Sequence, residues 1–208
     1  MLLVLLVFVL TGCTPIKNKT INNIIDEAVS SKLRVHNVIR NGYKFYAPRG
    51  LKLVESINYN EKMSDNVYDY YLYIDLVSFY KNVKKEYVIN EKSFYSNVIE
   101  KDDKFGYLEI NKYQKDKYLI EIMYNYAKIE VIVEEVNLNR ALTYAMSVLS
   151  SLEYNKNVLD NMIGDNILQF SEVEFDIFET HSSDGNFLDY EENSETLEEI
   201  LPDMDLVK

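Results

Sequence analysis

The sequence predicts an α+β fold: one antiparallel sheet, flanked by an N-terminal and a C-terminal helix. Segments in which apolar and polar residues alternate, as they do in strands, are grouped between residues 43 and 133. Apolar residues with helical spacing stand before and after this group, at residues 21–29 and 138–149. Grouped strands with helices outside the group are typical of the α+β class. The composition of the 208 residues, 47% hydrophobic and 27% charged, is sufficient for one globular core.

The first helix is expected to begin after Thr20, whose hydroxyl suits the N-cap position, and to end near Ser31. Five apolar side chains share one face of this helix and are expected to pack on the domain. They are Ile21, Ile24, Ile25, Ala28 and Val29.

The first two strands are expected on either side of a turn. Residues 43–47 alternate as a strand, and Pro48-Arg49-Gly50 is typical of a turn. A second strand then contains Leu51 and Leu53.

One loop and one long strand are expected next. Residues 58–66 are polar and predict a loop. Residues 67–79 are rich in Tyr, Val and Ile and predict a strand in which Asp75 shares a face with Tyr71 and Tyr73.

The next segment is ambiguous, and the pattern becomes clear after it. Residues 81–103 are mostly polar, with a short helix over 91–99 as one interpretation. Residues 107–112 and 118–124 predict a hairpin, and residues 128–133 predict a further strand.

The closing helix is expected to begin after Asn137 as N-cap. Its apolar face consists of Leu138, Ala141, Leu142, Ala145, Val148 and Leu149. Leu152–Tyr154 is expected to end the body as a short extended segment.

Two of these segments carry a family resemblance. Phe45-Tyr46-Ala47-Pro48-Arg49-Gly50-Leu51 resembles the opening strand-turn-strand of the PsbP-like fold, with its aromatic residue, proline, glycine and following hydrophobic residue. The closing helix, which runs through Met146 to Tyr154, resembles the ending of that fold. The resemblance covers residues 43–154 and implies an architecture. It implies no catalytic site, because many domains of this fold have none known.

The N-terminus carries an export pattern. Residues 2–10 are an uninterrupted apolar run, too short to span a membrane but within the range of a signal-peptide core. Leu10-Thr11-Gly12-Cys13 follows and resembles the lipobox of exported bacterial lipoproteins. The resemblance implies a signal peptide over residues 1–12, a lipidated Cys13, and a tether over residues 13–19. The mature chain would lie on the extracytoplasmic face of the cell membrane, anchored by its acyl chains. A buried free cysteine is the alternative.

The charge divides the chain near residue 155. Residues 156–208 contain 15 acidic and 2 basic residues, whereas residues 1–155 contain 19 acidic and 20 basic ones. This step predicts a body over 20–155 and an acidic tail over 156–208.

Within the tail, a short helix is expected over residues 158–163, and disorder from Thr180 onward. Val173, Phe175 and Ile177 alternate with acidic residues as in a strand, and are candidate contacts for a sheet edge or a basic partner surface. The alternative is a tail that only keeps the protein soluble.

Several kinds of chemistry have no support in the sequence. A net charge of -12 argues against nucleic acid, because phosphates would be repelled. The two histidines, His36 and His181, have no metal-binding or triad spacing, and His36 is expected to be exposed or capping. No glycine-rich phosphate loop or Gly-x-Ser-x-Gly motif is present. The sequence therefore predicts neither a metal nor a cofactor, and no catalytic residue is assigned.

The sequence contains 18 tyrosines, and they are concentrated in the predicted sheet. Tyrosine suits half-buried strand surfaces, and it also suits binding faces. Tyr71 and Tyr73 are the candidate partner-binding residues of the body, beside Asp75 on the same predicted face. We expect a binding protein of the cell envelope, whose partner is another envelope protein or a surface polymer. The alternative is a lipid-anchored enzyme that acts through carboxylates. An open sheet edge or flat tyrosine face would favour binding, and carboxylates gathered in a pocket would favour the enzyme.

Overall fold

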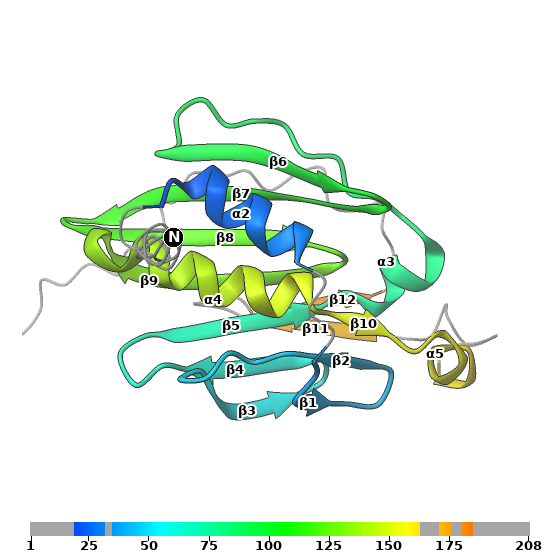
Figure 1. The fold of residues 1–208 in the computed structure, drawn as a ribbon. Helices are drawn as coiled ribbons and strands as arrows, with labels where there is room; N and C mark the ends of the chain where they lie inside the picture. The colour runs from blue at the N-terminus through cyan, green and yellow to red at the C-terminus, as the bar shows by residue number, and fades with distance from the viewer. Residues whose placement is uncertain (1–18, 32–34, 163–170, 176–179, 185–208) are drawn as a thin grey trace, which may run out of the picture.

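The computed structural model describes residues 19–31, 35–162, 171–175 and 180–184. Its central element is a seven-stranded antiparallel sheet with the strand order β3-β4-β5-β9-β8-β7-β6. Helices α2 and α4 lie on one face of this sheet, here called the inner face (Figure 1). The expected α+β class is confirmed. The strands of the sheet are β3 (Lys52–Ile57), β4 (Asn60–Ser64), β5 (Asp69–Ile74), β6 (Tyr95–Lys101), β7 (Lys104–Gln114), β8 (Lys117–Tyr124) and β9 (Ala127–Glu134).

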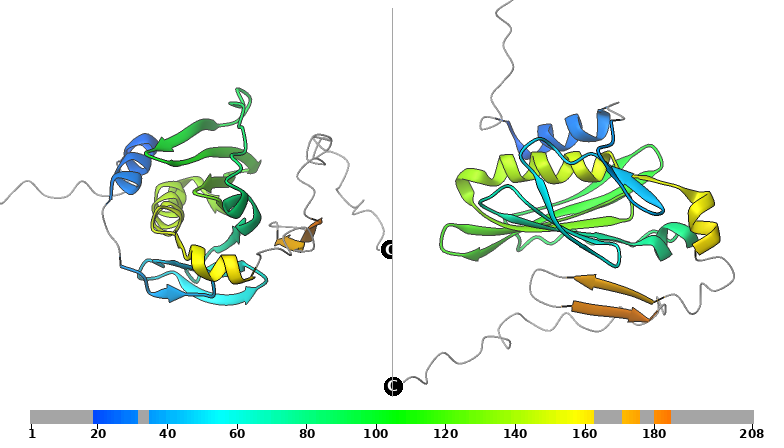
Figure 2. Two further views of the ribbon diagram at one scale, coloured as in Figure 1. Left: turned by 90° about the vertical axis from the view of Figure 1, so that its right-hand side faces the viewer. Right: turned by 90° about the horizontal axis from the view of Figure 1, so that it is seen from below.

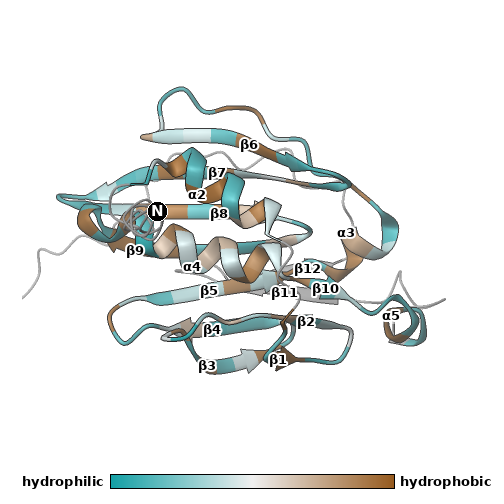
Figure 3. Ribbon diagram, in the orientation of Figure 1, coloured by the Kyte–Doolittle hydropathy of each residue, from teal (hydrophilic) through white to brown (hydrophobic). Residues whose placement is uncertain are grey.

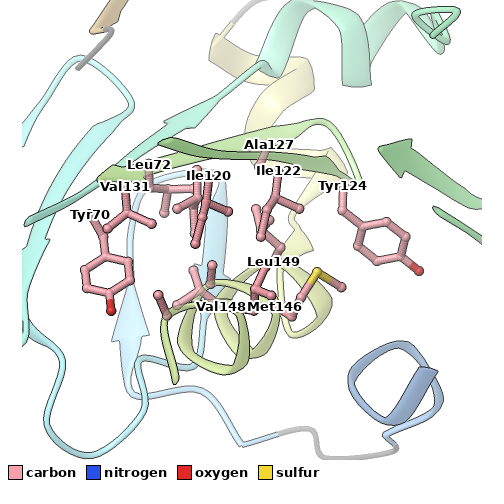
Figure 4. Packing of buried hydrophobic residues seen from close by; sticks show 14 of the residues in the cluster. Tyr70, Leu72, Ile120, Ile122, Tyr124, Ala127, Val131, Met146, Val148 and Leu149 are labelled. Carbon is pink, nitrogen blue, oxygen red and sulfur yellow. The ribbon is translucent and has the colours of Figure 1, made fainter. Parts of the chain in front are cut away.

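Helix α4 (Leu138–Ser150) fills the concave inner face, and all six residues of its predicted apolar face are buried. Side chains of β5, β8 and β9, such as Leu72, Ile122 and Val131, point toward Val148 and Leu149 of α4 (Figure 4). Alternate residues of a strand share a face, so the register places one apolar residue in every two against this helix.

The start of α4 differs from the expectation in one detail. A short 3-10 helix, η3 (Glu135–Asn137), precedes it, and the Asn137 side chain makes no cap hydrogen bond. The Asn137 amide instead donates to the Tyr68 hydroxyl at 2.8 Å, which ties the helix start to the turn before β5.

Helix α2 (Ile21–Ser30) begins as expected, with the Asn23 N–H donating to the Thr20 hydroxyl at 3.2 Å. It packs beside α4 and β6. A second, three-stranded sheet in the order β1-β2-β10 joins the two ends of the body. Its strands are β1 (Val38–Ile39), β2 (Tyr43–Phe45) and β10 (Glu153–Tyr154).

The predicted loop over residues 58–66 is wrong, because most of it forms β4. Asn58 and Tyr59 have φ values of 45° and 66° and make a two-residue turn between β3 and β4. Two left-handed residues are the requirement of the tight turn that matches strand twist, and asparagine tolerates this conformation. Met63 is the only apolar residue of β4, so the strand has no visible alternation in the sequence.

The predicted long strand over residues 67–79 is also wrong in its second half. Strand β5 ends at Ile74, and α3 (Leu76–Lys81) follows. The Asp75 carboxylate accepts a hydrogen bond from the Ser78 N–H at 2.8 Å, so Asp75 is the N-cap of α3 and not part of a strand face. The optional helix over residues 91–99 is contradicted by β6, which occupies an edge of the sheet.

The tail contributes to the fold in two places. Helix α5 (Lys156–Met162) inserts Leu159 into the main core, where it is fully buried, so the packed body extends beyond residue 155. Strands β11 (Ser171–Phe175) and β12 (Thr180–Asp184) form a separate antiparallel pair. The expected disorder is therefore wrong for Thr180–Asp184.

The β11–β12 pair lies on the side of the sheet opposite α2 and α4, here called the outer face (Figure 2), with β11 beside β4 and β5. Ile177 and Cys13 lie outside the described residues.

Candidate functional site

The two predicted binding tyrosines lie on the outer face of β5, and only one of them is accessible. The register places Tyr71 opposite Glu130 and Tyr73 opposite Lys128. Tyr73 is 5% exposed, so it is a packing residue and the prediction of a binding role for it is not supported. Tyr71 is half-buried, and the Lys62 ammonium lies 5.4 Å from the centre of its ring. Strand β11, which contains Val173 and Phe175, lies next to this part of the sheet.

A small hollow opens beside Tyr71, at the junction of β3, β4 and β5. Its volume is about 120 Å³, and its lining includes Glu55, Ile57, Lys62 and Tyr71. Glu55, Lys62 and Tyr71 stand in one row across the three strands. Lys62 also forms an ion pair with Asp69 at 3.0 Å, and this hydrogen bond raises the pKa of Lys62. The hollow therefore combines an apolar floor with a permanently charged ammonium.

Strand β3, on the rim of this hollow, is exposed along its whole length. It is the last strand in the order, and all six of its residues are exposed. Three of them are large and apolar: Leu53 is 39% exposed, Val54 is 59% exposed and Ile57 is 41% exposed. The pairing with β4 shifts between Leu53 and Glu55, which makes a β-bulge at Val54. Bulges and lysines such as Lys52 hinder the pairing of an edge strand with another strand. The part of β3 that remains regular and available to a partner strand is therefore Glu55–Ile57.

A row of three glutamates crosses the outer face farther along the sheet. Glu109, Glu121 and Glu130 stand directly opposite one another on β7, β8 and β9. Like charges in such positions repel, so each carboxylate needs a partner. The Tyr107 hydroxyl donates to Glu121 at 2.5 Å, and the Lys128 ammonium lies 3.2 Å from Glu130.

Glu109 is held by three donors from two segments. The Asn111 and Asn90 amides donate to it at 2.8 and 2.9 Å, and the Tyr87 hydroxyl donates to its other oxygen. Burial alone would raise the pKa of Glu109, but these hydrogen bonds outweigh it and hold the pKa below its ordinary value. Burial, assisted by the hydrogen bond to Glu109, raises the pKa of Tyr87 to about 12. At neutral pH the carboxylate is therefore charged and the hydroxyl is protonated.

Glu109 is not suited to act as a general acid. A general acid must hold a proton near neutral pH, which Glu109 does not. The hollow beside Tyr71 and a second one between β1, β2 and β10 are lined by none of the three glutamates. The described residues also contain no group of three potential metal ligands.

Two other residues singled out by the sequence have structural roles. Asp75 is buried at the start of α3, where Lys85 lies 3.0 Å from its carboxylate. His36 is half-buried rather than exposed, and its Nε2 lies 3.0 Å from the carbonyl oxygen of Ser151, the C-cap of α4. Both residues therefore hold helix ends in place.

The β3 edge and its hollow were missed from the sequence, apart from Tyr71. The signal for the hairpin is the polar pair at Asn58-Tyr59 between Leu53–Ile57 and Met63, which fits a two-residue turn. No local signal indicates which strand ends the sheet, because the strand order is set by pairings between distant segments.

No protein-family model matches this chain, and no curated protein matches it significantly. Among the described residues, no helix has the length and apolar character needed to cross a membrane.

Proposed function

We propose that this chain is a lipid-anchored lipoprotein on the extracytoplasmic face of the cell membrane, and that it acts by binding another component of the cell envelope. The anchor is the thiol of Cys13, as the lipobox resemblance implies. The binding element is the β3 edge with the hollow beside it. The partner is an envelope protein that supplies an extended segment, because an open strand edge recognises backbone and a polymer without peptide groups does not match it.

The observation that carries the binding proposal is the exposure of β3. Ile57 and Asn60 flank the two-residue turn and therefore form a hydrogen-bonded pair, so the N–H and C=O of Ser56 point away from β4 toward the open edge. An incoming segment hydrogen-bonds to these groups and places one side chain in the hollow lined by Ile57 and Tyr71. The Lys62 ammonium and the Glu55 carboxylate at this hollow favour a hydroxyl-bearing side chain there, because a hydroxyl can both donate and accept a hydrogen bond.

A proline at position 56 tests this proposal. Ser56→Pro removes an N–H that points outward, so it blocks strand addition and leaves the pairing of β3 with β4 intact. Ser56→Ala, the matched control, keeps the N–H. We expect mild crosslinking in native cells to capture the same partner with the wild type and Ser56→Ala, and to lose it with Ser56→Pro. Equal capture by all three chains would exclude the β3 edge.

The anchor has its own test. Cys13→Ala removes the only thiol of the chain, so labelling with a radioactive fatty acid should disappear and the protein should leave the membrane fraction or stay unprocessed. Unchanged label in Cys13→Ala would refute lipidation at this residue.

The alternative function, a lipid-anchored enzyme that acts through carboxylates, has one observation in its favour, the row Glu109–Glu121–Glu130. Hydrogen bonds and an ion pair occupy these carboxylates, and they line neither the hollow beside Tyr71 nor the one between β1, β2 and β10. Binding is therefore the better supported function.

A further inference from the structure

The segment between α3 and β6 exposes apolar side chains at the edge of the sheet opposite β3. Residues 83–94 run along the outside of β6, at the top of Figure 1, and Figure 3 shows hydrophobic residues within this segment. Val88 is 85% exposed, Ile89 is 51% exposed and Phe94 is 52% exposed. Neighbouring exposed apolar residues of this size usually mark an interaction site.

The exposure is imposed by contacts on both sides of these residues. The Tyr87 ring stacks on Tyr107, with centres 4.0 Å apart and planes inclined by 3°. The Asn90 amide donates to Glu109 at 2.9 Å, and the Phe94 ring lies 4.7 Å from the Tyr118 ring. Because Tyr87 and Asn90 are fixed against the sheet, Val88 and Ile89 between them are held outward.

The same edge lies close to the proposed lipid anchor. The Tyr95 hydroxyl at the start of β6 donates to the Asn22 side chain in the first turn of α2. Cys13 precedes Thr20, the N-cap of α2, by seven residues, and an extended chain of this length spans at most about 25 Å. Acyl chains on Cys13 would therefore hold the start of α2, and with it the Tyr95 end of β6, near the bilayer.

We propose that the β6 edge rests on the membrane, with Val88, Ile89 and Phe94 in contact with the interfacial region of the bilayer. This inference rests on the lipid anchor of the proposed function. Lys85 of the segment is paired with Asp75 at 3.0 Å. The other two lysines, Lys84 and Lys92, are balanced by Glu86 and Glu91, so the contact depends on apolar burial and not on anionic lipids.

Three partly inserted side chains bind weakly by themselves. The anchor makes this contact effectively intramolecular and therefore sufficient to orient the domain. In this orientation β3, six strand spacings or roughly 30 Å away along the sheet, points away from the membrane toward a partner.

A single tryptophan tests the proposal, because the natural chain has none. The full-length chain with its acyl anchor is reconstituted into phosphatidylcholine vesicles that contain brominated phosphatidylcholine, a quencher of tryptophan fluorescence. Val88→Trp is the probe. Val54→Trp is the matched control, since Val54 is an exposed valine on the opposite edge of the sheet. Thermal unfolding of both variants checks that the fold is intact, and flotation of the vesicles measures anchoring.

The expected result is strong quenching with blue-shifted emission for Val88→Trp and no quenching for Val54→Trp, with no change when one third of the lipid is anionic. If the protein floats with the vesicles but Val88→Trp is not quenched, the membrane contact is overturned and the lipoprotein proposal still stands. A blue shift that depends on protein concentration and not on brominated lipid would reassign the surface to a second copy of the chain. Failure to float would overturn the anchor and, with it, this inference.

Discussion

Strands β6 and β3 end the same sheet, and their surroundings differ. Helix α2 packs beside β6 and residues 83–94 run along it, with the Tyr87 hydroxyl and the Asn90 N–H bonded to Ser96 of β6. No described strand pairs with the outer edge of β3. Lys52 and the bulge at Val54 are the features that hinder the addition of another strand to this edge.

Unpaired strand edges promote association, and proteins cover them or make them irregular. Here residues 83–94 cover the sheet beside β6 through contacts to the side chains of Ser96, Tyr107 and Glu109, and this cover exposes Val88 and Ile89. The other edge is open over Glu55–Ile57. The difference indicates two interfaces of different kinds: a firmly built apolar surface beside β6, and a backbone edge at β3. The β3 edge is suited to a peptide segment and the β6 surface to a lipid layer.

The largest expected effect on stability concerns the buried Arg40–Glu61 ion pair, which holds β4, the strand next to the open edge. The Glu61 side chain is fully buried, the Arg40 Nε donates to it at 2.7 Å, and the Tyr43 hydroxyl donates to it at 2.8 Å. Arg40→Leu leaves a buried carboxylate without its counter-charge, so we expect a loss of about 3–5 kcal/mol in the free energy of unfolding by denaturant titration.

Lys44→Leu is the control for this change, because the Lys44–Glu153 pair is exposed and its loss should cost at most about 1 kcal/mol. Similar costs for Arg40→Leu and Lys44→Leu would mean that the buried pair does not hold the β3 side of the sheet.

The next effect concerns the boundary between body and tail. Leu159 of α5 is fully buried in the main core, and Leu159→Ala should therefore cost about 3 kcal/mol of unfolding free energy. Asn157→Ala changes an exposed residue of the same helix and should leave the denaturation midpoint nearly unchanged. If Leu159→Ala were equally silent, the body would end near residue 155, as the charge step predicts.

A smaller effect on stability tests whether the β6 side of the sheet can be destabilised without the β3 side. Gly106 of β7 pairs with Ile99 of β6, and a Cβ there would stand 1.9 Å from the Met123 carbonyl oxygen on β8. Gly106→Ala should therefore push β7 from β8 and cost about 2 kcal/mol.

Hydrogen exchange locates this effect. Amide protection should fall in β6 and β7 and persist in β3–β5, while the exposed substitution Asn97→Ala should change neither region. Protection lost uniformly across the sheet would show that the two edges are not independent.

The contrast between the edges also explains what the sequence could predict. The central strands β7, β8 and β9 bury alternate residues against α4, and their alternation is visible in the sequence. Strand β4 has one buried apolar side chain, Met63, and β6 has one, Ile99, so neither strand shows a period that identifies it. Hydrophobic periodicity reports burial on one face, and strands near an edge bury too little to display it.

The candidate site was only partly predictable for a similar reason, because the exposure of its residues is set by strands that are distant in the sequence. Tyr71 was predictable as a strand tyrosine on the outer face, but the exposure of β3 depends on pairings between distant segments. Tyr73 alternates with Leu72 in the sequence just as Tyr71 does, and its burial is set by neighbours that the local pattern does not contain. The switch from strand to helix occurs at Asp75, whose carboxylate accepts a hydrogen bond from the Ser78 N–H and pairs with Lys85, a residue ten positions away.

The smallest expected effect is a pH dependence confined to the covered edge. The hydrogen bonds from Tyr87, Asn111 and Asn90 hold the pKa of Glu109 below its ordinary value, against the opposing effect of burial. A carboxyl whose pKa is lower in the folded state contributes stability above its unfolded pKa of about 4.3, and that stability is lost as the pH falls through the folded pKa.

Tyr87→Phe removes one of these hydrogen bonds and should cost about 1 kcal/mol at neutral pH, but less once the pH has fallen below the folded pKa of Glu109, where the wild type has lost the same contribution. Hydrogen exchange in residues 83–101 should report this loss, and exchange in β3 and β4 should not change. A double-mutant cycle with Glu109→Gln isolates the pair, because Tyr87→Phe should have little further effect once the carboxylate is absent. If the coupling were zero, or equal at pH 7 and in acid below the folded pKa of Glu109, Tyr87 would be held by its stacking on Tyr107 and its hydrogen bond with Ser96 rather than by the Glu109 carboxylate. The outward position of Val88 would then not depend on the Tyr87–Glu109 hydrogen bond, and loss of this bond in acid would leave the contact between this edge and the membrane unchanged.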